Sequence, residues 1–511
     1  MRIERTKNAG RNMVFGTLMR IYQIVMPFVI RTFMIRYMGA AYTGLSGLFT
    51  SILHVLNLAE LGVGSAMVYS MYQAIAEDNH DEICALMRLY RRYYRIIGIV
   101  VLVVGLAIMP LLPVLVNKDV PADISINTLY LMNLAYTVAS YWLFAYRSSL
   151  VQAYQRNDII SKVTICANTI MYALQLAAII LFDNYYVYTS ALILGQILIN
   201  VLTAIASSRM YPQYRPEGEL SAEKVAAINH RIRDLFTSKI GAVVLDSCDS
   251  LVITAFLGLE MLAIHQNYYY VITALAMFFT VFFTSLVAGV GNSIATETTE
   301  HNYGLFREIT FITIYALGFC CTCMFCLYQP FIKLWVGEKL MLGNDLVILY
   351  CVFFFIYEFC RMLNLFKDAA GIWHADRFRP LVVSMANLGI NILLVKHIGL
   401  AGVLISTIVS YYFLNFPWLV RNVFTYVFDR KSGAYLGQAA LLVAVGVVSC
   451  VVSYYCCGFI QMGGFVGLVV RFGICVVCNT VVQLPVYLRF EEFRRTCQRA
   501  MNILRRHKMV S

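Results

Sequence analysis

The stretch NLAELGVGSAMVYS, residues 57–70, lies in a long apolar run and carries two glycines separated by one residue, Gly62 and Gly64. A similar stretch, SLVAGVGNSIA, returns in the second half of the chain with Gly289 and Gly291 at its centre. The same glycine pair in two apolar runs predicts that the chain contains two copies of one helical bundle. Glycines inside membrane helices allow a bend or a close approach of neighbouring helices, so these four residues are predicted to have a structural or gating role.

The composition is that of a membrane protein. Hydrophobic residues make up 60% of the 511 residues, charged residues only 13%, and the mean hydropathy is +0.71. Apolar runs of about 20 residues recur along the chain, and each can cross a hydrocarbon layer of about 30 Å as a helix. We therefore predict an all-α polytopic membrane protein with about fourteen transmembrane helices.

The charge distribution sets the expected orientation. Lys and Arg number 40 against 28 Asp and Glu, an excess that in a soluble protein could indicate nucleic-acid binding. Here the basic residues cluster in every second loop, which follows the positive-inside rule and predicts that both termini are cytoplasmic. We therefore expect contact with membrane lipids and no nucleic-acid partner.

The predicted spans fall into groups of six, six and two. The spans are 12–36, 43–73, 95–116, 125–153, 159–182, 185–207, 236–258, 262–294, 308–330, 346–366, 380–396, 398–420, 434–457 and 464–488. These divide the chain into an N-terminal bundle (1–207), a polar cytoplasmic linker (208–235), a C-terminal bundle (236–430), two additional spans (431–488) and a basic cytoplasmic tail (489–511). Six spans per half make the two bundles parallel repeats.

Basic residues inside spans are the candidates for binding an anionic substrate, because charges in a membrane are costly and usually functional. Arg20 and Arg31 lie on one face of the first span. Aligning RYMGA with AFLGL places Arg20 on Lys239, so a cation recurs at one depth in both bundles. Such a pair could clamp a phosphate group; the alternative is that each cation neutralises lipid headgroups or a nearby acid.

Acidic residues inside spans are the candidates for coupling transport to a Na⁺ or proton gradient. These are Asp246 and Asp249 on the seventh span and Glu60 beside the first glycine pair. A salt bridge to Lys239 would explain Asp246 equally well. Glu358 and Arg361, three residues apart on one span, are expected to pair with each other.

Two loops also repeat. AYQRNDIISKV matches GIWHADRFRPL and places Asp158 on Asp376, and a basic residue that follows an aromatic one precedes each loop, Arg147 and Lys367. A gating role and simple anchoring to the membrane both remain open for these four residues.

The sequence contains no catalytic constellation. A Walker loop, HExxH and GxSxG are all missing, so we expect a secondary transporter rather than an enzyme. Most of the 15 cysteines lie in predicted spans, including those of CCTCMFC (320–326). We expect these to be small packed thiols, and we expect neither a metal site nor a cofactor.

Several segments together resemble one family. They include PFVIRTFMIRYMGAAYTGLSGLF (27–49), AYRSSLVQAYQRNDIISK (145–162), DSLVITAFLGL (249–259), QPFIKLWVG (329–337) and FKDAAGIWHADRFRPLV (366–382). Over about residues 8–430 the chain resembles the Wzx-type oligosaccharide flippases, members of the multidrug/oligosaccharidyl-lipid/polysaccharide exporter superfamily. The resemblance implies a V-shaped pair of six-helix bundles around a cationic cavity that opens alternately to the two sides of a bacterial plasma membrane.

The implied substrate is an oligosaccharide repeat unit on undecaprenyl pyrophosphate, moved from the inner to the outer leaflet for capsule, exopolysaccharide or another surface glycan. A monomer working beside glycosyltransferases and a polysaccharide polymerase is expected. The alternatives are a cation-coupled multidrug antiporter of the same fold, which would favour acidic residues in its cavity, and a membrane polysaccharide polymerase or glycosyltransferase, which would need a large external loop.

Overall fold

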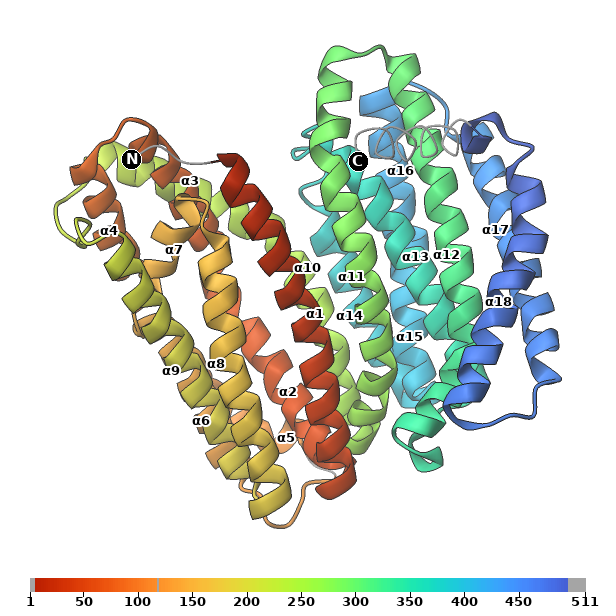
Figure 1. The fold of residues 1–511 in the computed structure, drawn as a ribbon, viewed down its shortest axis with the longest axis horizontal. Helices are drawn as coiled ribbons and strands as arrows, with labels where there is room; N and C mark the ends of the chain where they lie inside the picture. Colours follow the sequence, from red (N-terminus) through yellow and green to blue (C-terminus); the bar gives the residue numbers. More distant parts are fainter. Residues whose placement is uncertain (1–4, 117–118, 495–511) are drawn as a thin grey trace. The chain divides into compact units, whose positions relative to one another are not determined.

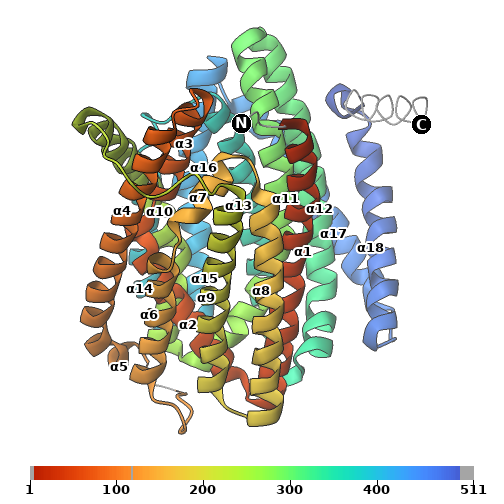
Figure 2. The ribbon, with the colours of Figure 1, turned by 60° about the vertical axis from the view of Figure 1, so that its left-hand side comes forward.

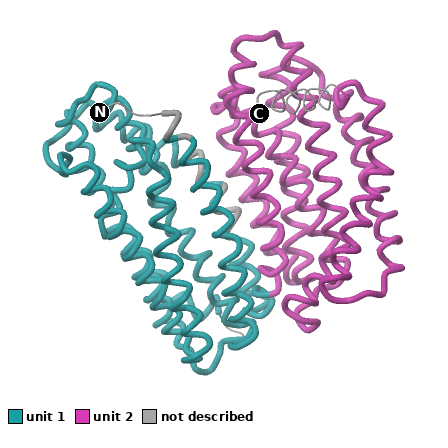
Figure 3. Tube along the Cα trace, viewed as in Figure 1, with its two compact units in different colours: residues 1–263 teal, residues 264–511 magenta. Residues whose placement is uncertain are grey.

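The computed structural model describes residues 5–116 and 119–494, without the side chains of residues 5–7, 9, 237–239, 242 and 244–246. Throughout these described residues every regular element is a helix, which confirms the predicted all-α fold. The chain forms two compact units, residues 1–263 (unit 1) and residues 264–511 (unit 2), coloured separately in Figure 3.

Unit 1 is built from long helices linked by short turns (Figure 1). Its helices are α1 (Arg5–Tyr37), α2 (Ala40–Leu56), η1 (Asn57–Glu60), α3 (Val63–Ala76), α4 (His80–Ile108), η2 (Met109–Leu111), α5 (Leu112–Leu115), α6 (Ile126–Trp142), α7 (Tyr146–Ala153), α8 (Asn157–Ala177), η3 (Ala178–Phe182), α9 (Tyr185–Met210) and α10 (Ala222–Leu257). Helix α8 packs between α1 and α9, as Figure 2 shows, and α4 and α9 both pack on α6.

Helix α10 occupies part of the segment expected to be a linker. Residues 208–235 are polar, but Ser221 caps a helix there by accepting a hydrogen bond from the backbone N–H of Lys224. The residues after it, Ala222 to Asp234, are mostly good helix formers, so the helix continues without interruption into the apolar stretch. Only residues 211–221 therefore connect α9 with α10, and α10 packs on α2 and α3 within unit 1.

Unit 2 is organised around α12. Its elements are α11 (Leu259–Thr296), which starts at the end of unit 1, α12 (Thr299–Trp335), η4 (Glu338–Leu340), α13 (Asn344–Ala369), α14 (Arg379–Ile398), α15 (Leu400–Val409), η5 (Ser410–Asn415), α16 (Phe416–Val423), η6 (Phe424–Phe428), α17 (Gly433–Gly458) and α18 (Gly464–Tyr487). Helix α12 packs on α13 and also on α17 and α18, the two C-terminal helices drawn in blue in Figure 1.

Twelve helical stretches of the described residues are long and apolar enough to cross a membrane. The chain is therefore a multi-pass membrane protein. The two remaining predicted spans fall on α6 and α7, where α6 has 17 residues, and on α10, whose described apolar stretch is Ser247–Leu257.

Backbone landmarks show how the two halves correspond. Gly39 (φ +107°) precedes α2 and Gly258 (φ +95°) precedes α11. The N-cap of α4 is Asn79, which accepts from the N–H of Glu82, and the N-cap of α12 is Thr298, which accepts from the N–H of His301. Both pairs have the same offset, because 258 − 39 and 298 − 79 each give 219. The landmarks bracket one span in each half and fix its register.

In this register the two glycine pairs do not correspond. An offset of 219 places Gly62 on Val281, and Gly289 lies about two helical turns further along α11. The local structures differ as well: Gly62 has a left-handed backbone (φ +89°) where the helix breaks between η1 and α3, whereas α11 runs unbroken through Gly289. A short glycine pattern in apolar sequence is therefore weaker evidence of register than helix caps are.

Candidate functional site

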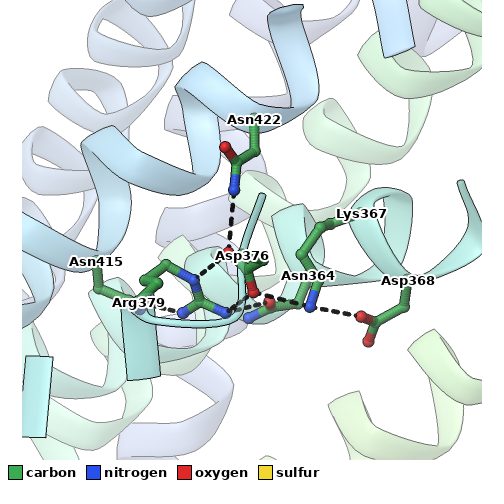
Figure 4. A network of polar contacts seen from close by, with 7 residues as sticks. All are labelled: Asn364, Lys367, Asp368, Asp376, Arg379, Asn415 and Asn422. Atoms are coloured by element: carbon green, nitrogen blue, oxygen red, sulfur yellow. Dashed lines mark hydrogen bonds and ion pairs between the residues drawn. The ribbon is translucent and has the colours of Figure 1, made fainter. Parts of the chain in front are cut away.

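A network of mostly buried polar side chains surrounds the loop between α13 and α14 in unit 2 (Figure 4). We call it the Asp376 cluster; its members are Asn364, Lys367, Asp368, Asp376, Arg379, Asn415 and Asn422. Lys367 belongs to the last turn of α13, and Arg379 is the first residue of α14. Of these seven residues, the sequence predicts only Lys367 and Asp376 as site residues.

Asp376, which is 4% exposed, accepts hydrogen bonds on both carboxylate oxygens. Arg379 donates from Nε to Oδ1 at 2.6 Å and from a terminal nitrogen to Oδ2 at 2.7 Å. Lys367 Nζ donates to Oδ2 at 3.0 Å, and Asn422 Nδ2 on α16 donates to Oδ1 at 3.0 Å. One carboxylate therefore ties α13, α14 and α16 together.

The two cations of the cluster have further partners. Arg379 also donates to Asn415 on η5 and to Asn364 Oδ1 at 3.1 Å. Lys367 contacts the Asp368 carboxylate at 2.7 Å and lies over the ring of Trp373, 5.0 Å from its centre. The guanidinium and ammonium groups are thus held from several sides, as buried charges require.

The electrostatics favour the charged form of Asp376. Burial by itself raises the pKa of this carboxyl, but the hydrogen bonds and charges of Arg379 and Lys367 outweigh burial and hold the pKa below its ordinary value. The Asp376 carboxylate is therefore ionised at neutral pH, and together with Asp368 it balances the charges of Lys367 and Arg379.

Unit 1 contains a counterpart, the Asp158 cluster, formed by Asn12, Arg156, Asp158 and Lys162 at the start of α8. Asp158 is fully buried. It pairs with Arg156 Nε at 2.9 Å and Lys162 Nζ at 3.3 Å, and its backbone N–H donates to Asn12 Oδ1 at 2.8 Å. The Asn12 side chain also donates to the carbonyl of Gln155, which attaches α1 to this loop.

Arg147 does not join that cluster, although it was paired with Lys367 by sequence. Arg147 is the second residue of α7, and its guanidinium donates to the backbone carbonyl of Tyr214 at 3.3 Å. The Tyr214 hydroxyl in turn lies 2.6 Å from that of Tyr154. Arg147 therefore fixes the connection between α9 and α10 rather than the loop before α8.

Glu60 lies where the second span of unit 1 breaks. Its Oε1 accepts a 2.5 Å hydrogen bond from the hydroxyl of Tyr94, which in turn accepts one from Tyr90 at 2.6 Å. Tyr141 donates to Asn57 Oδ1 at 2.7 Å in the same region. The break thus presents a carboxylate surrounded by tyrosines from α4 and α6.

The remaining predicted residues are dispersed. Arg20 is exposed on α1, and Arg31, half-buried on the same helix, donates to the carbonyl of Ala263 at 3.1 Å. Asp249 is half-buried on α10, while the side chains of Lys239 and Asp246 lie outside the described residues. The pairing of Arg20 with Lys239 thus stays a prediction.

Glu358 and Arg361 pair as expected. Their side chains are 2.9 Å apart, the carboxylate is fully buried, and Arg361 also donates to Thr280 on α11 at 2.6 Å.

Some residues of the two clusters are not predicted from the sequence. Arg156, Lys162 and Arg379 stand out only as charges beside the two repeated loops. The sequence does not identify Asn12, Asn415 and Asn422 as members of these clusters. Uncharged amides are not unusual in apolar helices, and their distance from the aspartates in sequence gives no indication that they meet.

Helices long and apolar enough to cross a membrane, joined by short loops, define a polytopic all-α membrane protein. The fold matches that of the lipid II flippase MurJ in an inward closed conformation, with a TM-score of 0.67 and 14% identity over 93% of this chain and 99% of that one. It also matches an inward-facing multidrug resistance MATE family transporter of the MOP superfamily, with a TM-score of 0.59 and 11% identity over 79% and 94%.

A third similar structure is the MATE transporter VcmN of Vibrio cholerae, with a TM-score of 0.52 and 12% identity over 80% of this chain and 97% of that one. Among curated proteins, no sequence matches the chain. The family model described as "Polysaccharide biosynthesis protein" matches residues 9–288, more than half of the chain. The chain belongs to this polysaccharide biosynthesis protein family.

Proposed function

We propose that this protein is a flippase that moves undecaprenyl-pyrophosphate-linked oligosaccharide repeat units from the inner to the outer leaflet of a bacterial plasma membrane. The observation that carries the proposal is membership of the polysaccharide biosynthesis family over residues 9–288. The fold supports it, because a lipid II flippase shares that fold over nearly its whole length. The product would feed a polymerase that assembles capsule, exopolysaccharide or another surface glycan.

The chemistry of the substrate suggests roles for the basic residues of the first span. A pyrophosphate needs cations, and Arg20 on α1 is exposed and so accessible to a headgroup. Arg31 donates a hydrogen bond to the carbonyl of Ala263, so in this proposal it contributes less than Arg20 to phosphate binding. In this proposal Lys239 completes a clamp with Arg20, both termini face the cytoplasm, and the protein acts as a monomer.

Energy for transport is proposed to come from a Na⁺ or proton gradient. Glu60 is the best-placed carboxylate, because it lies at a helix break and is hydrogen-bonded to Tyr94. A proton or cation that displaces this hydrogen bond would act directly on the joint between η1 and α3. Asp249 and Asp246 are the second candidates.

The test is a direct transport assay. The purified protein is reconstituted in vesicles with a fluorescent undecaprenyl-pyrophosphate oligosaccharide, and exposure on the opposite leaflet is followed by quenching. We expect Arg20→Gln to lower the initial rate roughly tenfold or more, since a charge-assisted contact contributes about 1.5–3 kcal/mol. Arg36→Gln, a second exposed arginine at the end of α1, is the matched control and should transport normally.

Two outcomes would contradict separate parts of the proposal. Equal rates for Arg20→Gln and the unchanged protein would remove the phosphate clamp but not the flippase. Absence of flipping by the unchanged protein, together with no accumulation of lipid-linked oligosaccharide on the inner leaflet after depletion in cells, would remove the flippase itself.

The MATE-like fold supports one other function, a multidrug antiporter. That function predicts efflux of cationic dyes, with a carboxylate such as Glu60 as the binding group. Dye efflux by the unchanged protein that is abolished by Glu60→Gln, without any flipping of the lipid-linked oligosaccharide, would favour the antiporter.

A further inference from the structure

Three cysteines that are far apart in the chain meet inside unit 2. Cys326 lies on α12, Cys457 at the end of α17 and Cys475 on α18, and their sulfur atoms all lie within 4.8 Å of one another. Their residues are only 6%, 5% and 0% exposed. Three separate helices thus direct thiols to one point.

A fourth thiol extends the group. Cys323 lies one turn before Cys326 on α12, in a Cys-x-x-Cys pattern that places both side chains on the same helix face, and it packs against the other three residues. The Cys475 thiol is within hydrogen-bonding reach of the thiols of Cys323, Cys326 and Cys457. We call these four residues the thiol cluster, with Cys475 at its centre.

We propose that the thiol cluster is a structural binding site for one thiophilic metal ion, of the Zn²⁺ or Cu⁺ type. Thiolates are the preferred ligands of these ions, and four thiols make a complete tetrahedral set for zinc. Zinc–sulfur bonds of about 2.3 Å place the sulfurs of a tetrahedral site roughly 3.8 Å apart. The sulfurs of Cys326, Cys457 and Cys475 already lie within 4.8 Å of one another, close to this spacing, and Cys323 packs against them as the fourth ligand.

The charge of such a site has a nearby partner. Each thiol that binds the ion loses its proton, so four thiolates around a divalent ion carry a net negative charge. Arg471 lies one helical turn before Cys475 on α18, and its guanidinium donates to the carbonyl of Ile460 at 2.8 Å. The backbone carbonyl of Arg471 also accepts from the Cys457 thiol at 3.7 Å. The positive charge of Arg471 also interacts electrostatically with Cys457, so it would offset part of the thiolate charge.

The site would attach the C-terminal helices to the rest of unit 2. Helices α17 and α18 both pack on α12, and a metal held by ligands from all three would join them by coordinate bonds. This role is independent of the proposed flippase activity.

The test uses the full-length protein purified in detergent under reducing conditions. Incubation with Zn²⁺ and removal of free metal should leave about one zinc per chain by elemental analysis, and Co²⁺ as a probe should give sulfur-to-cobalt charge-transfer bands. Cys475→Ala should lose both signals and any rise in melting temperature that zinc gives the unchanged protein. Cys360→Ala, which removes a buried thiol of α13 outside the cluster, should keep them.

Equal metal content in the unchanged protein and Cys475→Ala would overturn the proposal, as would a disulfide between Cys457 and Cys475 in peptide maps of the unreduced protein. If Cys475→Ala does not fold, Cys323→Ala replaces it, because Cys323 is only partly buried. Affinity for Zn²⁺ should then fall at least about tenfold, and unchanged affinity would restrict zinc binding to the other three thiols and reject the four-thiol site.

Discussion

The Asp376 cluster of unit 2 and the Asp158 cluster of unit 1 each neutralise a buried aspartate, but they do so with cations at different positions. Each loop ends in a buried aspartate that precedes or begins a transmembrane helix. Asp376 pairs with Lys367, nine residues earlier, and Arg379, three residues later. Asp158 pairs instead with Arg156, two residues earlier, and Lys162, four residues later.

The two clusters also differ in contact with solvent. Lys367 and Arg379 side chains are 7% and 8% exposed, whereas those of Arg156 and Lys162 are 23% and 44% exposed. What the two loops share is therefore a neutralised carboxylate, not a particular set of cations. The difference predicts unequal contributions to stability, because solvent screens the ion pairs of unit 1 far more than those of unit 2.

The largest effect is expected for Asp376→Asn. The change leaves Lys367 and Arg379 as buried cations without their shared counter-charge, which should cost about 3–5 kcal/mol in the free energy of unfolding. Thermal unfolding of the purified protein measures this loss. Asp368→Asn is the matched control, since Asp368 contacts Lys367 from a side chain that is 40% exposed and should cost far less.

Equal melting temperatures for these two variants would mean that the Asp376 cluster does not hold α13, α14 and α16 together. A melting temperature of Asp376→Asn far below that of the control would support the comparison.

A smaller effect is expected for Asp158→Asn. The aspartate is buried, but both of its cations reach solvent and can be hydrated when the carboxylate is lost. We expect a cost of about 1–2 kcal/mol, measured in the same thermal unfolding experiment. A loss equal to that of Asp376→Asn would show that exposure of the cations does not decide the contribution of these clusters.

The smallest expected effect is the change with pH in the stability difference between the unchanged protein and Asp376→Asn. Because the pKa of Asp376 is lower in the folded protein than its ordinary value of 3.8, its contribution to stability is fully present above pH 3.8 and is lost as pH falls through the lower, folded pKa. The stability difference between the unchanged protein and Asp376→Asn should therefore be constant from neutral pH down to about pH 5. It should shrink by at most about 1.4 kcal/mol per pH unit below pH 3.8.

Melting temperatures of both proteins across this range check the prediction. A difference that already shrinks between pH 7 and pH 5 would contradict a lowered pKa of Asp376.

Much of the fold could be predicted from sequence because hydropathy reports directly on membrane spans. The positions of the long helices follow from apolar runs, and the two aspartate loops follow from a local repeat that preserves the order of charged and aromatic residues. The segment 208–235 shows the limit of this reasoning. Its polarity suggested a linker, but the capping by Ser221 and the helix propensity of the residues after it extend α10 through half of it.

The candidate sites were harder to predict because they depend on convergence in space. Arg147 and Lys367 occupy similar places in sequence, yet one contacts a backbone carbonyl and the other a carboxylate. Asn422 reaches Asp376 from 46 residues away, and Cys475 reaches Cys326 from another helix. Local patterns identify which residues are unusual, but only packing determines which of them meet.

The break at Gly62 divides the second span of unit 1 into two helical segments, whereas the corresponding span of unit 2, α11, is continuous. The left-handed backbone of Gly62 separates α2 and η1 on one side from α3 on the other. A side chain at this glycine would come within 2.6 Å of Leu235 Cβ on α10, so the joint is also closely packed. Helices α2 and α3 can therefore meet at an angle that an unbroken helix such as α11 cannot contain, and the packing of Leu235 holds that angle.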